Sequence, residues 1–152
     1  MPTITFTTII NASLERCFDI SRDIDIHVAS TAQTGERAIA GRTSGLIGPG
    51  ESVTWRARHF GLWQNLTSKV TEFDRPNYFI DEMVEGAFKS FCHEHRFDAD
   101  GEGGTIVTDI FSYQSPLGLL GRFADWLFLK RYMTRLLEQR NRVIKAEAEK
   151  LQ

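Results

Sequence analysis

The stretch that decides the fold is Thr105–Leu151, TIVTDIFSYQSPLGLLGRFADWLFLKRYMTRLLEQRNRVIKAEAEKL, because its residue pattern changes part-way along. As far as Tyr113 the segment is rich in β-branched and aromatic residues, which is typical of a strand. Pro116 and Gly118 end this segment, and beyond them the apolar residues recur at steps of three and four. The sequence therefore predicts a last strand followed by one helix of about 30 residues, roughly 45 Å long.

The predicted helix, Leu119–Leu151, is apolar at its start and charged at its end. Its first turns are apolar on nearly every side, so we expect that end to be packed into the protein. From Leu117 onward the chain has eight Lys and Arg against four Asp and Glu, a net charge of +4 that leaves −6 for the rest. We interpret this asymmetry first as attraction within the molecule and second as a face for a partner. One stripe of the helix contains Trp126, Leu129, Met133, Leu136, Arg140 and Val143.

Upstream of this helix, the sequence contains further segments with the pattern of strands. They are Thr3–Ile10, Arg37–Gly41, Glu51–Phe60, Leu62–Phe73, Asn77–Glu85, Phe88–Asp98 and the last strand, Thr105–Tyr113. Most of their connections are short turns, which predicts an antiparallel meander because parallel strands need long crossovers. Two short helices are expected after the first strand, one over Ala12–Ile20 with Asn11 as its cap and one capped by Ser21.

These elements predict an α+β fold, in which a seven-stranded antiparallel sheet curves around a long C-terminal helix. One helix fills only part of the concave face of such a sheet, so we expect a cavity between sheet and helix. With 152 residues, the chain has the length of a single domain, residues 1–152.

The composition excludes several classes of protein. Hydrophobic residues make up 41% and charged residues 25%, as in ordinary globular proteins rather than disordered ones. A net charge of −2 argues against a nucleic-acid binder. Two cysteines are too few for a disulfide scaffold, and neither the N-terminal residues nor Phe123–Leu129 has the pattern of a leader or a membrane span. We therefore expect a cytoplasmic protein with no integral membrane association.

Several short stretches resemble a known superfamily. They are Phe79-Ile-Asp81-Glu82, Gly86-Ala-Phe88, Phe91-x-His93-x-His95-x-Phe97, Thr108-Asp109 and Tyr113-x-x-Pro116-Leu-Gly118. Together with the order of the elements, they resemble the helix-grip (SRPBCC) superfamily of START lipid-transfer domains, plant pathogenesis-related allergens and polyketide cyclases. The resemblance is to its bacterial polyketide cyclase/dehydrase-like or ligand-binding branch. It implies a hydrophobic pocket for a small molecule between sheet and helix, and it transfers no catalytic residue set.

The most distinctive local motif places two histidines between two phenylalanines on one strand face. Because residues two apart on a strand point the same way, Phe91, His93, His95 and Phe97 share a face. A symmetric hairpin after this strand would pair His93 with Asp109. That pair has the composition of a general base and its orienting group, as in an aldol-type cyclase or dehydratase. The alternative, which we favour, is an internally satisfied polar patch that shapes ligand specificity.

A metal site at these histidines needs a third ligand. His-x-His on one strand is able to chelate zinc or iron, and the nearest third ligands by sequence are Asp109 and His59. No other residues have ligand spacing, so the expectation is that the protein holds no metal and no other cofactor.

Apolar residues on neighbouring strands and on the helix are expected to form the walls of the cavity. Val53, Trp55 and Ala57 alternate on one strand, and Leu66, Ser68 and Val70 alternate on the next. With the histidine strand and the helix, the predicted ligand-binding set is Trp55, Leu66, Phe91, His93, His95, Phe97, Phe111, Trp126 and Leu129. Such a pocket is mostly apolar with few polar groups, as small-molecule sites usually are.

Other candidate motifs have ordinary interpretations. Cys92 and His93 point to opposite strand faces, so His93 cannot serve Cys92 as a base. Cys17 lies on the apolar stripe of the first short helix, and neither cysteine is expected to act as a nucleophile. The glycine-rich loop Gly45–Gly50 lacks the Lys-Ser/Thr of a phosphate-binding loop and is expected to form a lip of the pocket. Asp98–Gly104 partly matches a calcium loop, but strands flank it, so it is expected to be a hairpin turn.

Three functions remain open at this stage. The first is binding or transport of a small hydrophobic molecule, lipid-like or polyketide-like, without catalysis. The second is a cyclase or dehydratase that uses His93 and Asp109. The third is a regulatory module that contacts a protein or membrane surface, either through the basic C-terminal helix, with Arg131, Arg135 and Arg142, or through the aromatic entrance Leu119–Leu129. A homo-oligomer is compatible with each of them.

Overall fold

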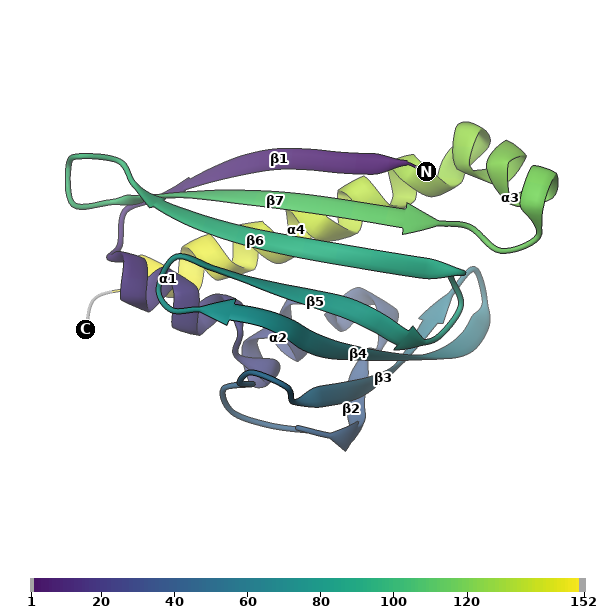
Figure 1. Cartoon of the computed structure of the whole chain (residues 1–152), viewed down its shortest axis with the longest axis horizontal. Helices are drawn as coiled ribbons and strands as arrows, with labels where there is room; N and C mark the ends of the chain where they lie inside the picture. The colour runs from purple at the N-terminus through teal and green to yellow at the C-terminus, as the bar shows by residue number, and fades with distance from the viewer. Residues whose placement is uncertain (1, 151–152) are drawn as a thin grey trace.

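A computed structural model describes residues 2–150 and contains one antiparallel sheet with α4 and α2 behind it (Figure 1). Its strands are β1 (Thr3–Ile10), β2 (Arg37–Gly41), β3 (Ser52–His59), β4 (Leu62–Asp74), β5 (Tyr78–Glu85), β6 (Ser90–Ala99) and β7 (Thr105–Gln114). They lie in the order β1-β7-β6-β5-β4-β3-β2, so β2 to β7 form a meander and β1 closes it beside β7. The predicted seven-stranded meander is confirmed, with each strand boundary within two residues of the expectation.

The helices are α1 (Leu14–Ser21), α2 (Ile24–Ser30), the 3₁₀ turn η1 (Ala32–Thr34), α3 (Gly118–Ala124), the π-helical turn η2 (Asp125–Leu129) and α4 (Lys130–Ala148). The two short helices after β1 are confirmed, but their predicted caps are wrong. Ser13 Oγ accepts from Arg16 N, and Asp23 Oδ1 accepts from Asp25 N and Ile26 N. Both residues lie directly before a helix, within reach of the free amides of its first turn, whereas Ser21 is the last residue of α1.

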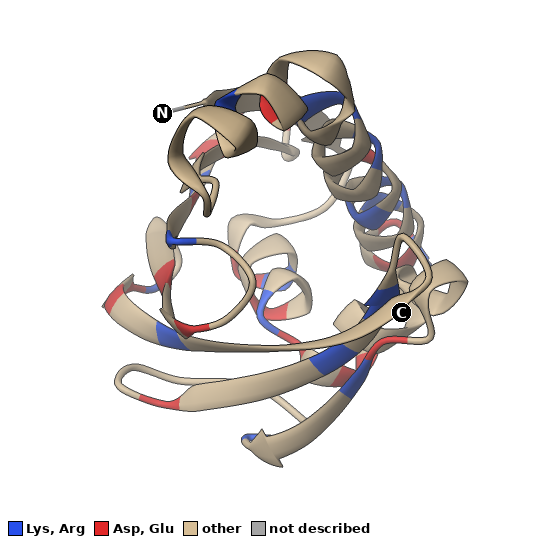
Figure 2. Ribbon diagram, turned by 90° about the vertical axis from the view of Figure 1, so that its right-hand side faces the viewer, with Lys and Arg blue, Asp and Glu red and all other residues tan. Residues whose placement is uncertain are grey.

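The long C-terminal helix is confirmed as a continuous run through α3, η2 and α4, and the sheet curves around it (Figure 2). Its predicted end, Leu151, lies outside the described residues. The π-helical turn adds about one residue to a regular helix and so rotates the preceding turns by about 100° relative to α4. The stripe deduced from a regular helical period is therefore broken at η2.

The apolar start of this helix is exposed, which corrects the expectation that it is packed into the protein. Leu119 is 79%, Leu120 72% and Trp126 79% exposed. Only Gly121 and Asp125 are buried along α3 and η2. No helix within residues 2–150 has both the length and the apolar content to cross a membrane.

Three apolar clusters pack on the concave side of the sheet. They are centred on Phe18, Phe79 and Phe97; on Phe91, Phe111, Tyr113 and Leu137; and on Ile24, Val53, Trp55 and Val70. Along β6, Phe91 belongs to one cluster and Phe97 to another, and the strand places His93 and His95 between them. The core is therefore interrupted by buried polar residues at its centre.

Candidate functional site

A cavity of about 360 Å³ lies between the concave face of the sheet and α4. Residues of α2, of strands β3 to β7 and of the C-terminal helix line it, and its walls are mostly apolar. Seven residues of the predicted ligand-binding set lie on these walls: Trp55, Leu66, Phe91, His93, His95, Phe111 and Leu129. The structure therefore brings most of the predicted set together around one space, and their role in ligand binding stays a prediction.

Two residues of the predicted set do not line the cavity. Trp126 is 79% exposed, because it lies within the π-helical turn, whose extra residue breaks the regular stripe between Trp126 and Leu129. Phe97 is buried against Phe18, with ring centroids 5.3 Å apart, under α1. Phe97 shares the face of His95 as predicted, but α1 covers that end of the sheet.

The predicted register of the β6–β7 hairpin is wrong by two residues. Ala99 pairs with Thr105, so His95 faces Asp109 and His93 faces Phe111. The hairpin turn itself is confirmed, but it is shorter than expected because Asp100 Oδ1 accepts from the amides of Glu102 and Gly104. A shift by an even number of residues leaves every side chain on its face, so the histidines still point into the fold.

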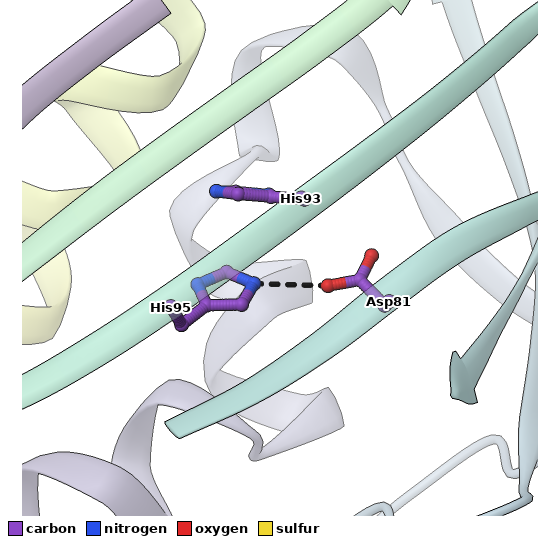
Figure 3. Close-up of side chains that lie close together, drawn as sticks. All are labelled: Asp81, His93 and His95. Atoms are coloured by element: carbon purple, nitrogen blue, oxygen red, sulfur yellow. Dashed lines mark hydrogen bonds and ion pairs between the residues drawn. The ribbon is translucent and has the colours of Figure 1, made fainter. Parts of the chain in front are cut away.

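The two histidines share one carboxylate. His93 Nε2 and His95 Nδ1 each lie 3.0 Å from Asp109 Oδ1. His95 Nε2 lies 2.9 Å from Asp81 Oδ1 (Figure 3). Because an ionised carboxylate only accepts, both nitrogens of His95 donate, and so does His93 Nε2. Asn141 Nδ2 donates to the other oxygen of Asp109. Asp109 is thus the centre of a network that β5, β6, β7 and α4 build together.

The ionisation states of these groups follow from burial and from their partners. Burial and the neighbouring His95 lower the pKa of His93 to about 4, so His93 is neutral at pH 7. Burial also opposes the charge on His95, but its two carboxylate partners outweigh burial and raise its pKa. Burial acts to raise the pKa of Asp109 and of Asp81, and their hydrogen bonds to histidine outweigh it and hold both pKa values below the ordinary range.

Arg140 completes the charge balance of the cluster. Its Nη1 lies 3.9 Å from Asp109 Oδ1, and its Nη2 donates to the Ser21 carbonyl at 2.9 Å. Two anions, Asp81 and Asp109, therefore face two cations, His95 and Arg140. Sequence reasoning placed Arg140 on the helix stripe without a role and did not select Asp81 or Asn141. A cation on an otherwise apolar stripe was the one signal that pointed to buried charge.

A second polar group lines another part of the cavity. His27 Nε2 lies 2.5 Å from Glu36 Oε1, and the His27 ring stacks on Trp55 with centroids 4.2 Å apart. His59 Nδ1 lies 2.6 Å from the Tyr132 hydroxyl oxygen. All five side chains line the cavity. Sequence reasoning named two of them, Trp55 as a ligand-binding residue and His59 as a metal ligand beside His93, whereas the structure pairs His59 with Tyr132.

The cysteines occupy the places expected of unreactive residues. Cys17 is buried in the apolar cluster under α1. Cys92 faces away from His93, and burial together with Glu82 raises the pKa of its thiol to about 11. A thiol with so high a pKa is not a thiolate near pH 7, which argues against a nucleophile.

The arrangement of sheet, helix and cavity agrees with a comparison to known families. Residues 1–149 match a family model described as polyketide cyclase/dehydrase and lipid transport. The chain belongs to this family. We also compared the chain with proteins that have curated descriptions, and none of them matches.

Solved structures share the fold of this polyketide cyclase/dehydrase family member over nearly its whole length. Protein TTHA0849 from Thermus thermophilus is 18% identical with a TM-score of 0.78, and each chain is covered to 97%. A START superfamily protein from Mycobacterium smegmatis is 13% identical with a TM-score of 0.73, again at 97% of each chain. Major latex-like protein 151 from Panax ginseng is 17% identical with a TM-score of 0.70, at 98% of each chain. These likenesses confirm the predicted helix-grip fold, and at such identities they establish nothing finer.

Proposed function

We propose that the protein binds or transports a small, largely hydrophobic molecule, lipid-like or polyketide-like, in the cavity between sheet and α4. The observation that carries this proposal is the combination of an apolar wall with two separate polar groups inside one cavity of about 360 Å³. Apolar walls supply most of the binding free energy, and a few fixed polar groups orient the ligand. The expected ligand is therefore amphipathic, with oxygen or nitrogen atoms at two places on an apolar skeleton.

Catalysis by His93 and Asp109, as in a cyclase or dehydratase, is the second candidate. The 3.0 Å hydrogen bond between them and the position of His93 on the cavity wall favour it. However, the pKa of His93, about 4, makes its imidazole a weak base near neutral pH. Asp109 is also shared with His95 and Asn141, so it is a common anchor rather than a dedicated orienting group. We therefore rank binding ahead of catalysis.

The first experiment tests whether the ligand binds in the cavity, by placing a larger side chain on the cavity wall. Ser68 lies on the cavity wall in β4, and Lys69 beside it is exposed on the opposite face. Native mass spectrometry of protein purified from its own host is expected to show a non-covalent adduct of small organic mass. Ser68→Phe should lose the adduct, whereas Lys69→Phe should keep it. An adduct retained in Ser68→Phe at wild-type occupancy would place the ligand elsewhere.

The second experiment separates binding from catalysis. Of the three tryptophans, only Trp55 lines the cavity, so the Trp63→Phe/Trp126→Phe double variant reports on the cavity alone. Its fluorescence is titrated with long-chain fatty acids and with hydroxylated aromatic compounds, with and without His93→Ala. A binder keeps saturable quenching with a changed affinity in His93→Ala. An enzyme converts one of these compounds, and that conversion stops in His93→Ala.

A further inference from the structure

We propose that Asp81, His93 and His95 form a binding site for a divalent transition-metal ion, zinc or ferrous iron, on the wall of the cavity (Figure 3). Asp81 comes from β5 and pairs with His93 of β6, and His95 follows on the same strand face. All three side chains line the cavity. Two imidazoles and one carboxylate are a donor set that suits both ions.

The distances within the set are close to those that a metal requires. One ligand atom from each residue lies within 4.8 Å of the other two, and His95 Nε2 and Asp81 Oδ1 are only 2.9 Å apart. Metal–ligand bonds of about 2.0–2.2 Å place ligand atoms roughly 3–3.5 Å apart in a tetrahedral site. Closing the set from at most 4.8 Å to that spacing therefore needs side-chain shifts of about 1–2 Å. All three side chains line the cavity, which leaves room for such shifts.

Asp109 already orients both imidazoles as metal sites require. Each ring donates one N–H to Asp109 Oδ1, from Nε2 of His93 and from Nδ1 of His95. The second nitrogen of each ring, Nδ1 of His93 and Nε2 of His95, then supplies the lone pair for a metal. A carboxylate behind each metal-binding histidine is the usual arrangement around such ions. Asn141 fixes that carboxylate in turn, so Asp109 is a positioning residue and Asp81 is the ligand.

In the metal-free protein, a proton lies where the metal would bind. His95 Nε2 donates that proton to Asp81, and metal binding would displace it. A divalent ion in place of the proton raises the net charge of the cluster by one. A bound hydroxide or an anionic ligand oxygen would restore the balance, and three protein ligands leave a coordination position open to the cavity for it.

The test measures metal binding directly and needs no knowledge of the organic ligand. Protein without a polyhistidine tag is stripped with a chelator and titrated with Zn²⁺ by calorimetry and with Co²⁺ by visible absorption. We expect one ion per chain and the absorption bands of four- or five-coordinate Co²⁺. His93→Gln should weaken binding at least 100-fold, and Asp109→Asn about 10–100-fold. The control His59→Gln removes another histidine of the same cavity and should bind as the wild type does.

Two outcomes would overturn the metal site. One is wild-type protein that binds neither ion more tightly than millimolar. The other is an equal loss of affinity in His93→Gln and His59→Gln, which would indicate adventitious binding. Because changes at Asp109 threaten folding, circular dichroism of each variant accompanies the titrations, and Asp81→Asn provides a second ligand variant. Failure of the metal site would leave the proposed ligand binding intact, since Ser68→Phe tests that independently.

A separate observation supports an interaction surface at the N-terminal end of the long helix, around α3 and η2. We infer that the exposed apolar residues of α3, η2 and the β3–β4 turn dock on an anionic lipid bilayer. On the helix they include Leu119, Leu120, Phe123, Trp126 and Leu127, and at the turn Phe60, Leu62 and Trp63. Phe60 contacts Phe128 and Tyr132, with centroids 5.5 Å and 4.6 Å apart, so the two groups form one surface. We call it the apolar end.

The positive charges around the apolar end favour an anionic lipid bilayer as its partner. Within residues 116–137, the exposed charged side chains are all cations: Arg122, Lys130, Arg131 and Arg135. The single acid of this segment, Asp125, is buried and accepts a hydrogen bond from Ser115. Leucine and aromatic side chains flanked by Lys and Arg are the composition of surfaces that lie in the headgroup region of anionic membranes. Phe60, Leu129 and Tyr132 also line the cavity, so docking would bring the cavity close to the lipid.

The test uses vesicles of phosphatidylcholine with and without phosphatidylglycerol. Wild-type protein should co-sediment with the anionic vesicles and detach as salt is raised. Leu119→Ser/Trp126→Ser should lower the bound fraction at least tenfold, whereas Ile9→Ser, which removes an exposed apolar side chain from β1, should not. Absence of binding to anionic vesicles would overturn the inference. So would a concentration-dependent dimer that Leu119→Ser/Trp126→Ser abolishes, because a second copy would then be the partner.

Discussion

The interior around Asp109 and the surface around Trp126 invert the usual distribution of residues in opposite ways. Asp109 is 1% exposed among other charged groups, whereas Trp126 is 79% exposed among other apolar ones. Charged residues are ordinarily outside and large apolar residues inside. Each region departs from that rule. The buried charges around Asp109 are compensated by partners within the protein, whereas the exposed apolar side chains around Trp126 are not covered by any described part of it.

The two regions are expected to contribute to different properties of the protein, the buried cluster to stability and the exposed surface to binding. Inside, two anions face two cations, and hydrogen bonds join them to one another and to the backbone, so removing any member leaves its partners uncompensated. Outside, the side chains of α3 and η2 pack against little, so removing them should cost the fold little. We therefore expect substitutions at the interior to change the free energy of unfolding, and substitutions at the apolar end to change binding to partners.

The largest effect is expected for Asp109→Ala. This change leaves His95 without its carboxylate at Nδ1, His93 without an acceptor and Asn141 without its main partner. Breaking a buried charged network in this way should cost about 3–5 kcal/mol of unfolding free energy. Urea denaturation measures it, with Asp98→Ala, an exposed site on β6, as the control. A loss below about 1 kcal/mol would contradict the view that Asp109 is the anchor of the cluster.

A smaller loss is expected for Arg140→Met. Methionine keeps most of the side-chain length, but Ser21 loses the donor to its carbonyl and Asp109 loses one cation. Hydrogen bonds to charged groups contribute about 1.5–3 kcal/mol, which sets the expected loss. Arg142→Met, two residues along α4 and exposed, should change the free energy by less than about 0.5 kcal/mol. Equal effects of the two substitutions would show that Arg140 is not part of the balanced cluster.

A pH-dependent effect is expected at the second polar group. Burial acts to raise the pKa of Glu36, but His27, His59 and Thr31 outweigh it and hold the pKa below its ordinary value. A carboxyl with a lowered pKa stabilises the fold above the pKa of the unfolded chain, about 4.3, and this contribution is lost as the pH falls through the folded pKa. Wild-type protein should therefore lose more stability between pH 7 and pH 3 than Glu36→Gln. Parallel curves of unfolding free energy against pH would refute the Glu36 contribution.

Much of the fold could be predicted from the sequence because its signals are local. Alternation in each strand, short turns between them and a long helical period after Pro116 are read from neighbouring residues, and all three were confirmed. The apolar start of the helix was misplaced, because apolar periodicity predicts burial without showing whether a partner surface exists. Trp126 was misplaced because a π-helical turn leaves no mark in an apolar pattern.

The candidate site could be predicted only along single strands. His93 and His95 were placed on one face from their spacing, and the error of two residues in the hairpin register preserved that face. Asp81, Asn141 and Arg140 approach the histidines from β5 and α4, and no local pattern relates them. Contacts between distant segments depend on the curvature of the sheet and on where α4 crosses it. Neither can be inferred from a single sequence.

The smallest effect on stability is expected for Trp126→Ser. Set beside a substitution of Trp55, it compares the same residue type on the surface and in the interior. Trp126 is largely exposed, so its loss should change the free energy of unfolding by less than about 0.5 kcal/mol. Trp55 is 8% exposed and stacks on His27, so Trp55→Ala should cost about 3–5 kcal/mol. Urea denaturation of both variants makes the measurement with one residue type in two settings. A cost above about 1 kcal/mol for Trp126→Ser would mean that this side chain is covered in solution, by a second copy of the chain or by a rearranged α3, and the apolar end would then be a packed interface rather than a free docking surface.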